Sequence, residues 1–136
     1  MLYRIAMALR WRLRRDLGRR GEDLAHGYLR RRKYVIVARN YRPSTGAPGE
    51  IDIIAREGDK LVFVEVKTRT NDAVAFPERA VDEDKRRYLI RTARDYARRA
   101  NVDWNDVRFD VISISGIKRP SIQHMKDAFG VDLSFA

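Results

Sequence analysis

Two short segments of the chain carry charged side chains inside runs that are otherwise apolar. In "GEIDIIAR", residues 49–56, Asp52 lies among isoleucines, and in "LVFVEVKTR", residues 61–69, Glu65 and Lys67 follow four apolar residues. Burying an isolated charge is costly unless the charge is paired or bound to a metal ion. We therefore interpret Asp52, Glu65 and Lys67 as candidate site residues. The alternative is a surface ion pair at the end of a half-exposed strand, which would contribute little.

The spacing of these residues predicts that they meet on one hairpin. Both segments are typical of strands, in which alternate side chains share a face, and "EGD" between them predicts a tight turn. Counted outward from Gly58, Asp52 and Glu65 are about equally distant, so they should lie nearly opposite each other. Two neighbouring carboxylates repel, and a divalent cation between them relieves that repulsion. Lys67 shares the strand face of Glu65 and can reach the same place.

Metal-assisted phosphodiester hydrolysis is the chemistry that such a set would serve. Oxygen ligands from Asp52 and Glu65 suit Mg²⁺ or Mn²⁺, and the metal would activate an attacking water. Lys67 would orient that water or stabilise the charge of the transition state. Glu22 would complete the site if a helix around it packs across the hairpin. An acid that answers the dipole of a helix N-terminus is the alternative for Glu22.

The rest of the chain predicts a single α/β domain at residues 19–136. A helix is expected first, then three strands, then a helix from Pro77 to Ala100 and a further strand over 107–115, with a short strand or turn near the end. The length of 136 residues allows one domain with its own core. Residues 1–18 predict a basic helical extension with an apolar stripe, laid on the domain or partly frayed. A basic arm that contacts phosphate or an anionic membrane is the alternative.

The net charge of +10 indicates a polyanionic partner. Nucleic acid is the first expectation, with an anionic membrane or ribosomal RNA as alternatives. The longest apolar run near the N-terminus is too short to span a bilayer. The absence of cysteine fits a cytoplasmic protein. The candidate phosphate contacts are the basic residues Arg30, Arg31, Arg32, Lys33, Arg69 and Lys85.

Several motifs together resemble a known family. The pattern of Asp52 followed by Glu65-Val66-Lys67 looks like the PD-(D/E)xK motif of restriction-endonuclease-like nucleases. The segments "GEDLAHGYL", "NYR", "GEIDIIAR", "VFVEVKTR", "RFDVI" and "HMKDAF" resemble the YraN-type family of predicted endonucleases, which is similar to archaeal Holliday-junction resolvases. The resemblance runs from about Arg19 to Phe129.

This resemblance implies an αβββαβ core with a metal site at one edge of a mixed sheet. By position, Asp52, Glu65 and Lys67 match the catalytic triad, and Glu22 matches the first-helix acid of the resolvases. Val66 would offer its backbone carbonyl to the metal, and Lys85 falls where many relatives place an extra polar residue. The implied activity is metal-dependent cleavage of DNA, including branched or structured DNA, by a homodimer. The alternatives are an inactive nucleic-acid-binding module and an RNA- or ribosome-associated protein.

Overall fold

The architecture of the chain is known from a computed structural model, which describes residues 2–69, 83–116 and 118–129. Two α-helices, one short 3₁₀ helix and five strands make up the described residues. In chain order they are α1 (Leu2–Arg31), β1 (Val35–Tyr41), β2 (Ile51–Glu57), β3 (Lys60–Arg69), α2 (Glu83–Arg99), η2 (Trp104–Asp106), β4 (Val107–Ser115) and β5 (Ser121–Met125).

The strands form one mixed sheet in the order β1-β2-β3-β4-β5. The first three strands are antiparallel neighbours, β3 and β4 run parallel, and β5 returns antiparallel to β4. A parallel pair requires a crossover connection, and α2 lies in that connection. The predicted α/β fold with its αβββαβ order is confirmed, and the sheet is consistent with a restriction-endonuclease-like core. The C-terminal segment that was expected as a strand or a turn contains the edge strand β5.

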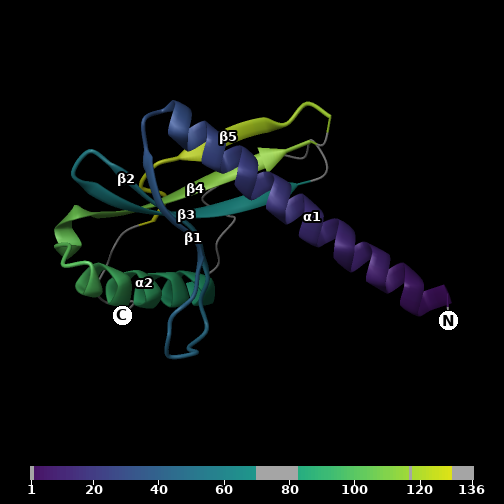
Figure 1. Cartoon of the computed structure of the whole chain (residues 1–136), viewed down its shortest axis with the longest axis horizontal. Helices are drawn as coiled ribbons and strands as arrows, with labels where there is room; N and C mark the ends of the chain where they lie inside the picture. Colours follow the sequence, from purple (N-terminus) through teal and green to yellow (C-terminus); the bar gives the residue numbers. More distant parts are fainter. Residues whose placement is uncertain (1, 70–82, 117, 130–136) are drawn as a thin grey trace.

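A helix covers each face of the sheet, so the core has two layers (Figure 1). One layer packs α1 residues, including Ala25 and Leu29, against the sheet, and the other packs α2 against the opposite face. Strict alternation predicts that Ile51 shares a face with Ile53. The structure instead places Ile51 with Ile54 in the cluster on the α2 side, and Ile53 in the cluster on the α1 side. The alternation of side chains therefore does not hold at the first residue of β2.

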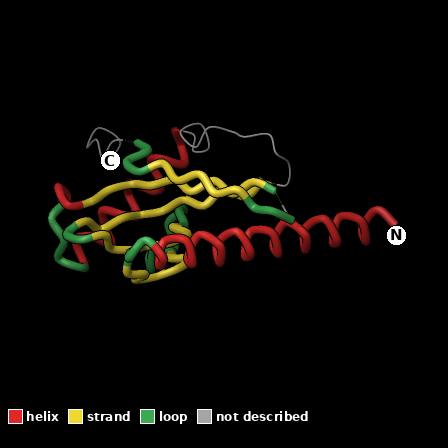
Figure 2. Tube along the Cα trace, turned by 90° about the horizontal axis from the view of Figure 1, so that it is seen from above, coloured by secondary structure: helices red, strands yellow, loops and turns green. Residues whose placement is uncertain are grey.

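The first helix is longer than the sequence indicates. The basic extension and the first domain helix form one continuous helix over Leu2–Arg31, so the expected division at residues 18 and 19 falls inside it. The N-terminal half extends past the strands (Figure 2), and Leu2 and Leu9 are 85% and 55% exposed. At Leu2 and Leu9 the segment is therefore not laid on the domain, whereas Leu17 is half-buried. Within the described part of the chain, no helix has the length and apolarity needed to cross a membrane.

Two glycines allow the close approaches that position the sheet edge. A Cβ at Gly21 of α1 would collide with the side chain of Thr68 near the end of β3. Gly49, just before β2, has a φ of +132°, and a Cβ there would lie 2.5 Å from Thr92 Oγ1 of α2. Only glycine adopts such a backbone without strain. Both contacts hold helices against the same end of the sheet, where Asp52 and Lys67 are located.

Candidate active site

The register of the β2–β3 hairpin brings Asp52 and Glu65 together. Ile53 pairs with Val64, so the next position of this antiparallel ladder sets Asp52 against Glu65. The Oδ2 atom of Asp52 accepts a hydrogen bond of 2.8 Å from the backbone N–H of Val66. In an extended strand the N–H and C=O of one residue point towards the same neighbouring strand. The carbonyl of Val66 therefore also points to the side of Asp52, as a metal-ligand role would require.

The carboxyl group of Asp52 is electrostatically disfavoured in its ionised form. Burial raises its pKa from 3.8 to about 8, and the negative charges of Glu65 and then Glu22 add to this effect. The hydrogen bond from Val66 acts in the opposite direction but is too weak to balance them. The raised pKa means that the pair favours uptake of a proton, or of a metal cation in its place.

Glu65 is the most enclosed acid at this end of the sheet, with a side chain that is only 5% exposed. Its Oε1 atom lies 3.4 Å from the Nζ of Lys67 and also forms an ion pair with Lys85 of α2. Its Oε2 atom is buried and has no hydrogen-bond partner. A buried carboxylate oxygen without a partner is rare and costly. This atom is thus a candidate ligand atom for a metal ion.

The two lysines at the site differ in their electrostatic state. Burial lowers the pKa of Lys67, and the neighbouring Lys85 contributes to the shift, although Glu65 opposes it. Burial also disfavours the charged form of Lys85, but its hydrogen bond to Glu65 raises its pKa overall. Lys85 therefore acts as the fixed counter-charge of Glu65, and Lys67 is the amine that can more easily release a proton or redirect its hydrogen bonds.

Glu22 lies near this pair but does not join it. Its carboxylate is 3.5 Å from Arg39 of β1, which also pairs with Asp23 at 2.8 Å. Its negative charge still contributes to the raised pKa of Asp52. In the ranges that the structure describes, no three Asp, Glu, His or Cys side chains come close enough together to form a metal site. A metal ion held here would thus depend on Asp52, Glu65, the Val66 carbonyl and water.

The predicted phosphate-binding residues fall in two places. Arg69 and Lys85 lie near the carboxylate pair, at the end of β3 and at the start of α2. The other four, Arg30, Arg31, Arg32 and Lys33, lie at the C-terminal end of α1. The start of the helix expected at Pro77 lies outside the described residues; its described part begins at Glu83.

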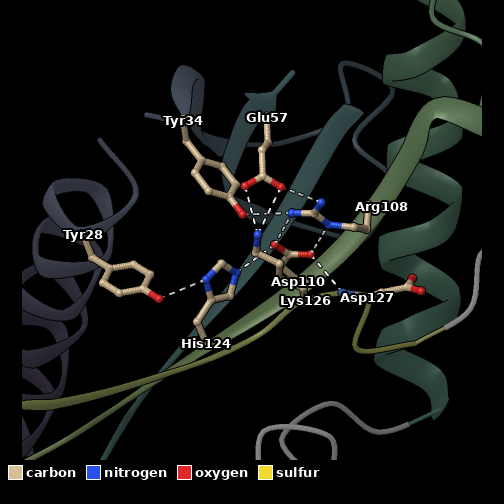
Figure 3. Close-up of polar contacts among 8 residues, drawn as sticks. All are labelled: Tyr28, Tyr34, Glu57, Arg108, Asp110, His124, Lys126 and Asp127. Atoms are coloured by element: carbon tan, nitrogen blue, oxygen red, sulfur yellow. Dashed lines mark hydrogen bonds and ion pairs between the residues drawn. The ribbon is translucent and has the colours of Figure 1, made fainter. Parts of the chain in front are cut away.

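Sequence reasoning missed a second polar cluster, in which Asp110 of β4 is fully buried between Arg108 and His124 (Figure 3). The signals for it in the sequence are the acid in the apolar run "RFDVISI" and Arg108 two residues before that acid, because the other partners of Asp110 come from distant segments. The register sets Asp110 beside Val64, one residue before Glu65, so Asp110 and Glu65 point to opposite faces of the sheet. Glu57, which belongs to it, closes β2 five residues after Asp52, or about 17 Å along the strand.

Comparison with other proteins assigns the chain to a family. The model of the uncharacterised protein family UPF0102 matches residues 21–114, which include the whole hairpin and the carboxylate pair. The chain belongs to the UPF0102 family. A UPF0102 protein of Solibacter usitatus is 50% identical over 130 residues, covering 95% of this chain and 98% of that protein. A UPF0102 protein of Geotalea uraniireducens is 43% identical over 119 residues, covering 85% and 90% of the two chains.

These UPF0102 relatives match the chain over nearly its full length, so the site belongs to the part that the family shares. Membership confirms the YraN-type resemblance at the level of the family. The family name carries no activity, and the chemistry of the site must be argued from its residues.

Proposed function

We propose that this UPF0102 protein is a metal-dependent nuclease that hydrolyses phosphodiester bonds of nucleic acid. The observation that carries the proposal is the pairing of Asp52 with Glu65, in which the pKa of Asp52 is raised to about 8 and Glu65 Oε2 is buried without a partner. Such perturbed acids are typical of functional sites. A purely structural ion pair would explain Glu65 with its lysines but not the second acid beside it.

In this proposal Asp52, Glu65 and Val66 bind a metal ion, and Lys67 orients the water or the phosphate. Asp52, Glu65 and the Val66 carbonyl supply oxygen atoms of the kind that Mg²⁺ and Mn²⁺ prefer. A bound ion would polarise a phosphate and lower the pKa of a water molecule. Lys67, whose own pKa is lowered, would orient that water or donate to the phosphate oxygens. Lys85 would keep the charge and position of Glu65 fixed.

The expected substrate is DNA rather than RNA, with branched or structured DNA included. The net charge of +10 supports attraction to the phosphate backbone without favouring a base sequence. Nothing in the sequence resembles a recognition helix or a zinc finger, so contacts to the phosphate backbone are expected to dominate. Cleavage of two strands calls for two such sites, and we propose a homodimer on that basis.

The test is a cleavage assay on linear, branched and single-stranded DNA and on RNA. Each substrate is incubated with Mg²⁺, Mn²⁺ or EDTA, and Glu65→Ala is compared with the wild type. Metal-dependent cleavage that is lost in Glu65→Ala would support the proposal. An exposed-acid variant, Asp59→Asn in the β2–β3 turn, serves as the control that should retain activity.

Two other outcomes would refute it. Binding of nucleic acid without cleavage in either metal would indicate an inactive binding module. Cleavage that Glu65→Ala retains would place the chemistry elsewhere or in a contaminant.

A further inference from the structure

A cavity lies at the C-terminal end of α1, and neither Asp52 nor Glu65 lines it. Its volume is about 650 Å³, which is sufficient for a nucleotide. The cavity is lined by Tyr28, Arg31, Arg32, Lys33, Tyr34, Glu57, His124 and Lys126. These residues come from the end of α1, the segment before β1, the end of β2 and β5, so the fold assembles the cavity from distant parts of the sequence.

The positive charge of this cavity is not balanced from within the described chain. Glu57 is neutralised by Arg108 at 2.8 Å and by Lys126 at 3.0 Å. Arg31, Arg32 and Lys33 form no ion pair with any residue that the structure describes. Three cations therefore converge on one cavity without an acidic partner. A phosphate group is the ligand class that such a site attracts.

A buried hydrogen-bond network fixes the aromatic wall of the cavity (Figure 3). Asp110, which has no exposed surface, accepts hydrogen bonds from Arg108 and from His124 Nε2 at 2.8 Å. The other ring nitrogen of His124 lies 3.2 Å from the hydroxyl of Tyr28. With Nε2–H donated to the carboxylate, Nδ1 is left to accept from the tyrosine. The orientation of the Tyr28 ring is thereby set from the core.

That ring in turn positions one of the cations. The guanidinium of Arg32 lies over the face of Tyr28, 4.4 Å from the ring centroid. A cation–π contact of this kind orients the side chain without neutralising its charge. The contacts from Asp110 through His124 and Tyr28 therefore position the guanidinium of Arg32 and leave its positive charge unneutralised.

The backbone at Lys33 gives an independent indication. Tyr34 N–H donates to Leu29 C=O at 3.0 Å, which closes α1 with a Schellman motif and places Lys33 in the left-handed conformation at φ 69°. Glycine or asparagine normally occupies this position, and α2 has Asn101 at the equivalent place with φ 59°. The helix dipole favours cations in the last turn. The dipole does not explain why a lysine occupies the left-handed position of Lys33, after the last turn of α1. We therefore take the backbone strain at Lys33 as an indication of function.

We propose that this cavity binds a phosphate monoester, with Arg31, Arg32 and Lys33 as the anion contacts and the Tyr28–His124–Asp110 network as their support. The ligand is the 5′-phosphate of a nucleic-acid end or of a free mononucleotide. The site stands independently of the proposed hydrolysis, because none of its residues belongs to the carboxylate pair.

Isothermal titration calorimetry in EDTA measures ligand binding to this cavity under conditions in which metal-dependent cleavage cannot occur. The probes are inorganic phosphate, deoxyadenosine monophosphate, deoxyadenosine, and one short oligonucleotide with either a 5′-phosphate or a 5′-hydroxyl. We expect phosphate-bearing probes to bind and their hydroxyl counterparts to bind at least tenfold more weakly, as for the loss of a charged hydrogen bond. Tighter binding of the phosphorylated oligonucleotide than of the mononucleotide would assign the ligand to a nucleic-acid end, and the reverse would assign it to a free nucleotide.

Variants separate binding from stability. Lys33→Gly should weaken phosphate binding about tenfold while leaving the melting temperature at least as high, since glycine relieves the strain. Asn101→Gly is the matched control, because it also introduces glycine at the left-handed position after a helix. Arg98→Ala is a second control that removes an exposed cation of α2. Both variants should bind phosphate like the wild type. The proposal is overturned if no phosphate probe binds below about 1 mM. It is equally overturned if Lys33→Gly and Arg32→Ala both bind like the wild type, or if Arg98→Ala weakens binding as much as they do.

Discussion

Replacing Asp52 by asparagine should stabilise the metal-free protein, even though it removes a residue of the candidate site. The amide keeps an oxygen that can accept from the Val66 N–H, as the carboxylate does at 2.8 Å. It removes the charge that the fold disfavours beside Glu65. Most substitutions at buried polar positions destabilise, so a gain in stability is the signature of an acid whose charged form is disfavoured by burial and by a neighbouring carboxylate.

The size of the effect follows from the raised pKa. The pKa of Asp52 is about 8 in the folded chain against 3.8 ordinarily, so the folded state binds more protons than the unfolded state between these values. The stability that this proton provides is fully present below pH 3.8 and is lost as the pH rises through 8. At pH 7 the loss is about 4 kcal/mol at most. Because Asp52 is part-exposed and solvent screens its charge, we expect a gain of about 1–3 kcal/mol from Asp52→Asn.

Urea unfolding in EDTA at several pH values between 4 and 9 measures this. The free energies of unfolding of the wild type and Asp52→Asn should agree near pH 4 and diverge towards pH 9, and the exposed control Asp59→Asn should show no such divergence. Adding Mg²⁺ or Mn²⁺ at one hundred times its Kd should then stabilise the wild type by about 2.7 kcal/mol and the variant by much less. A variant that is less stable at every pH, or a pH-independent difference, would refute the argument that burial and Glu65 disfavour the charged form of Asp52.

Three other perturbations probe the rest of the structure. Gly21→Ala should destabilise by about 1–3 kcal/mol, measured by urea unfolding, because its Cβ would collide with Thr68; Gly18→Ala, with open space around it, is the matched control. Asp110→Asn should destabilise by about 3 kcal/mol at pH 7, because it removes the buried carboxylate that pairs with Arg108 and accepts from His124, although Arg108 keeps its ion pair with Glu57. Burial alone would raise the pKa of Asp110, but hydrogen bonds from His124 and Arg108 lower it, so this loss should shrink only as the pH falls below about 3.8. Arg32→Ala should lower the slope of log affinity for DNA against log salt by about one, as expected for the loss of one phosphate contact.

The hairpin could be predicted because its register depends only on residues that are close together in the sequence. A two-residue turn fixes the register, so counting from Gly58 was sufficient to set Asp52 against Glu65, and the Ile53–Val64 pair confirms the count. The strand boundaries followed from β-branched and apolar runs for the same reason. The placement of Lys67 on the face of Glu65 required only the alternation of an extended strand, and the 3.4 Å contact bears it out.

Contacts between distant segments were not accessible in this way. The ion pair of Lys85 with Glu65 depends on how α2 packs on the sheet, which no local pattern specifies. Glu22 was expected to complete the site, but its neighbour Arg39 comes from β1 and pairs with it. The length of α1 was underestimated because Gly18 and Gly21 interrupt its pattern; Gly21 is needed for the approach to Thr68 and does not end the helix.

The two acids Asp52 and Asp110 show why burial alone does not identify a functional carboxylate. Asp110 has no exposed surface, yet its pKa is lowered, because His124, Arg108 and the Asp127 N–H all donate to it. Burial and the neighbouring Glu65 raise the pKa of Asp52, and a single backbone donor is not sufficient to oppose them. A carboxylate whose acceptor sites are filled by the protein has nothing left to offer a cation, whereas one that is opposed by a second acid gains from any cation that enters. The donors around each acid, rather than its depth, therefore place the candidate metal site at Asp52 and the structural support at Asp110.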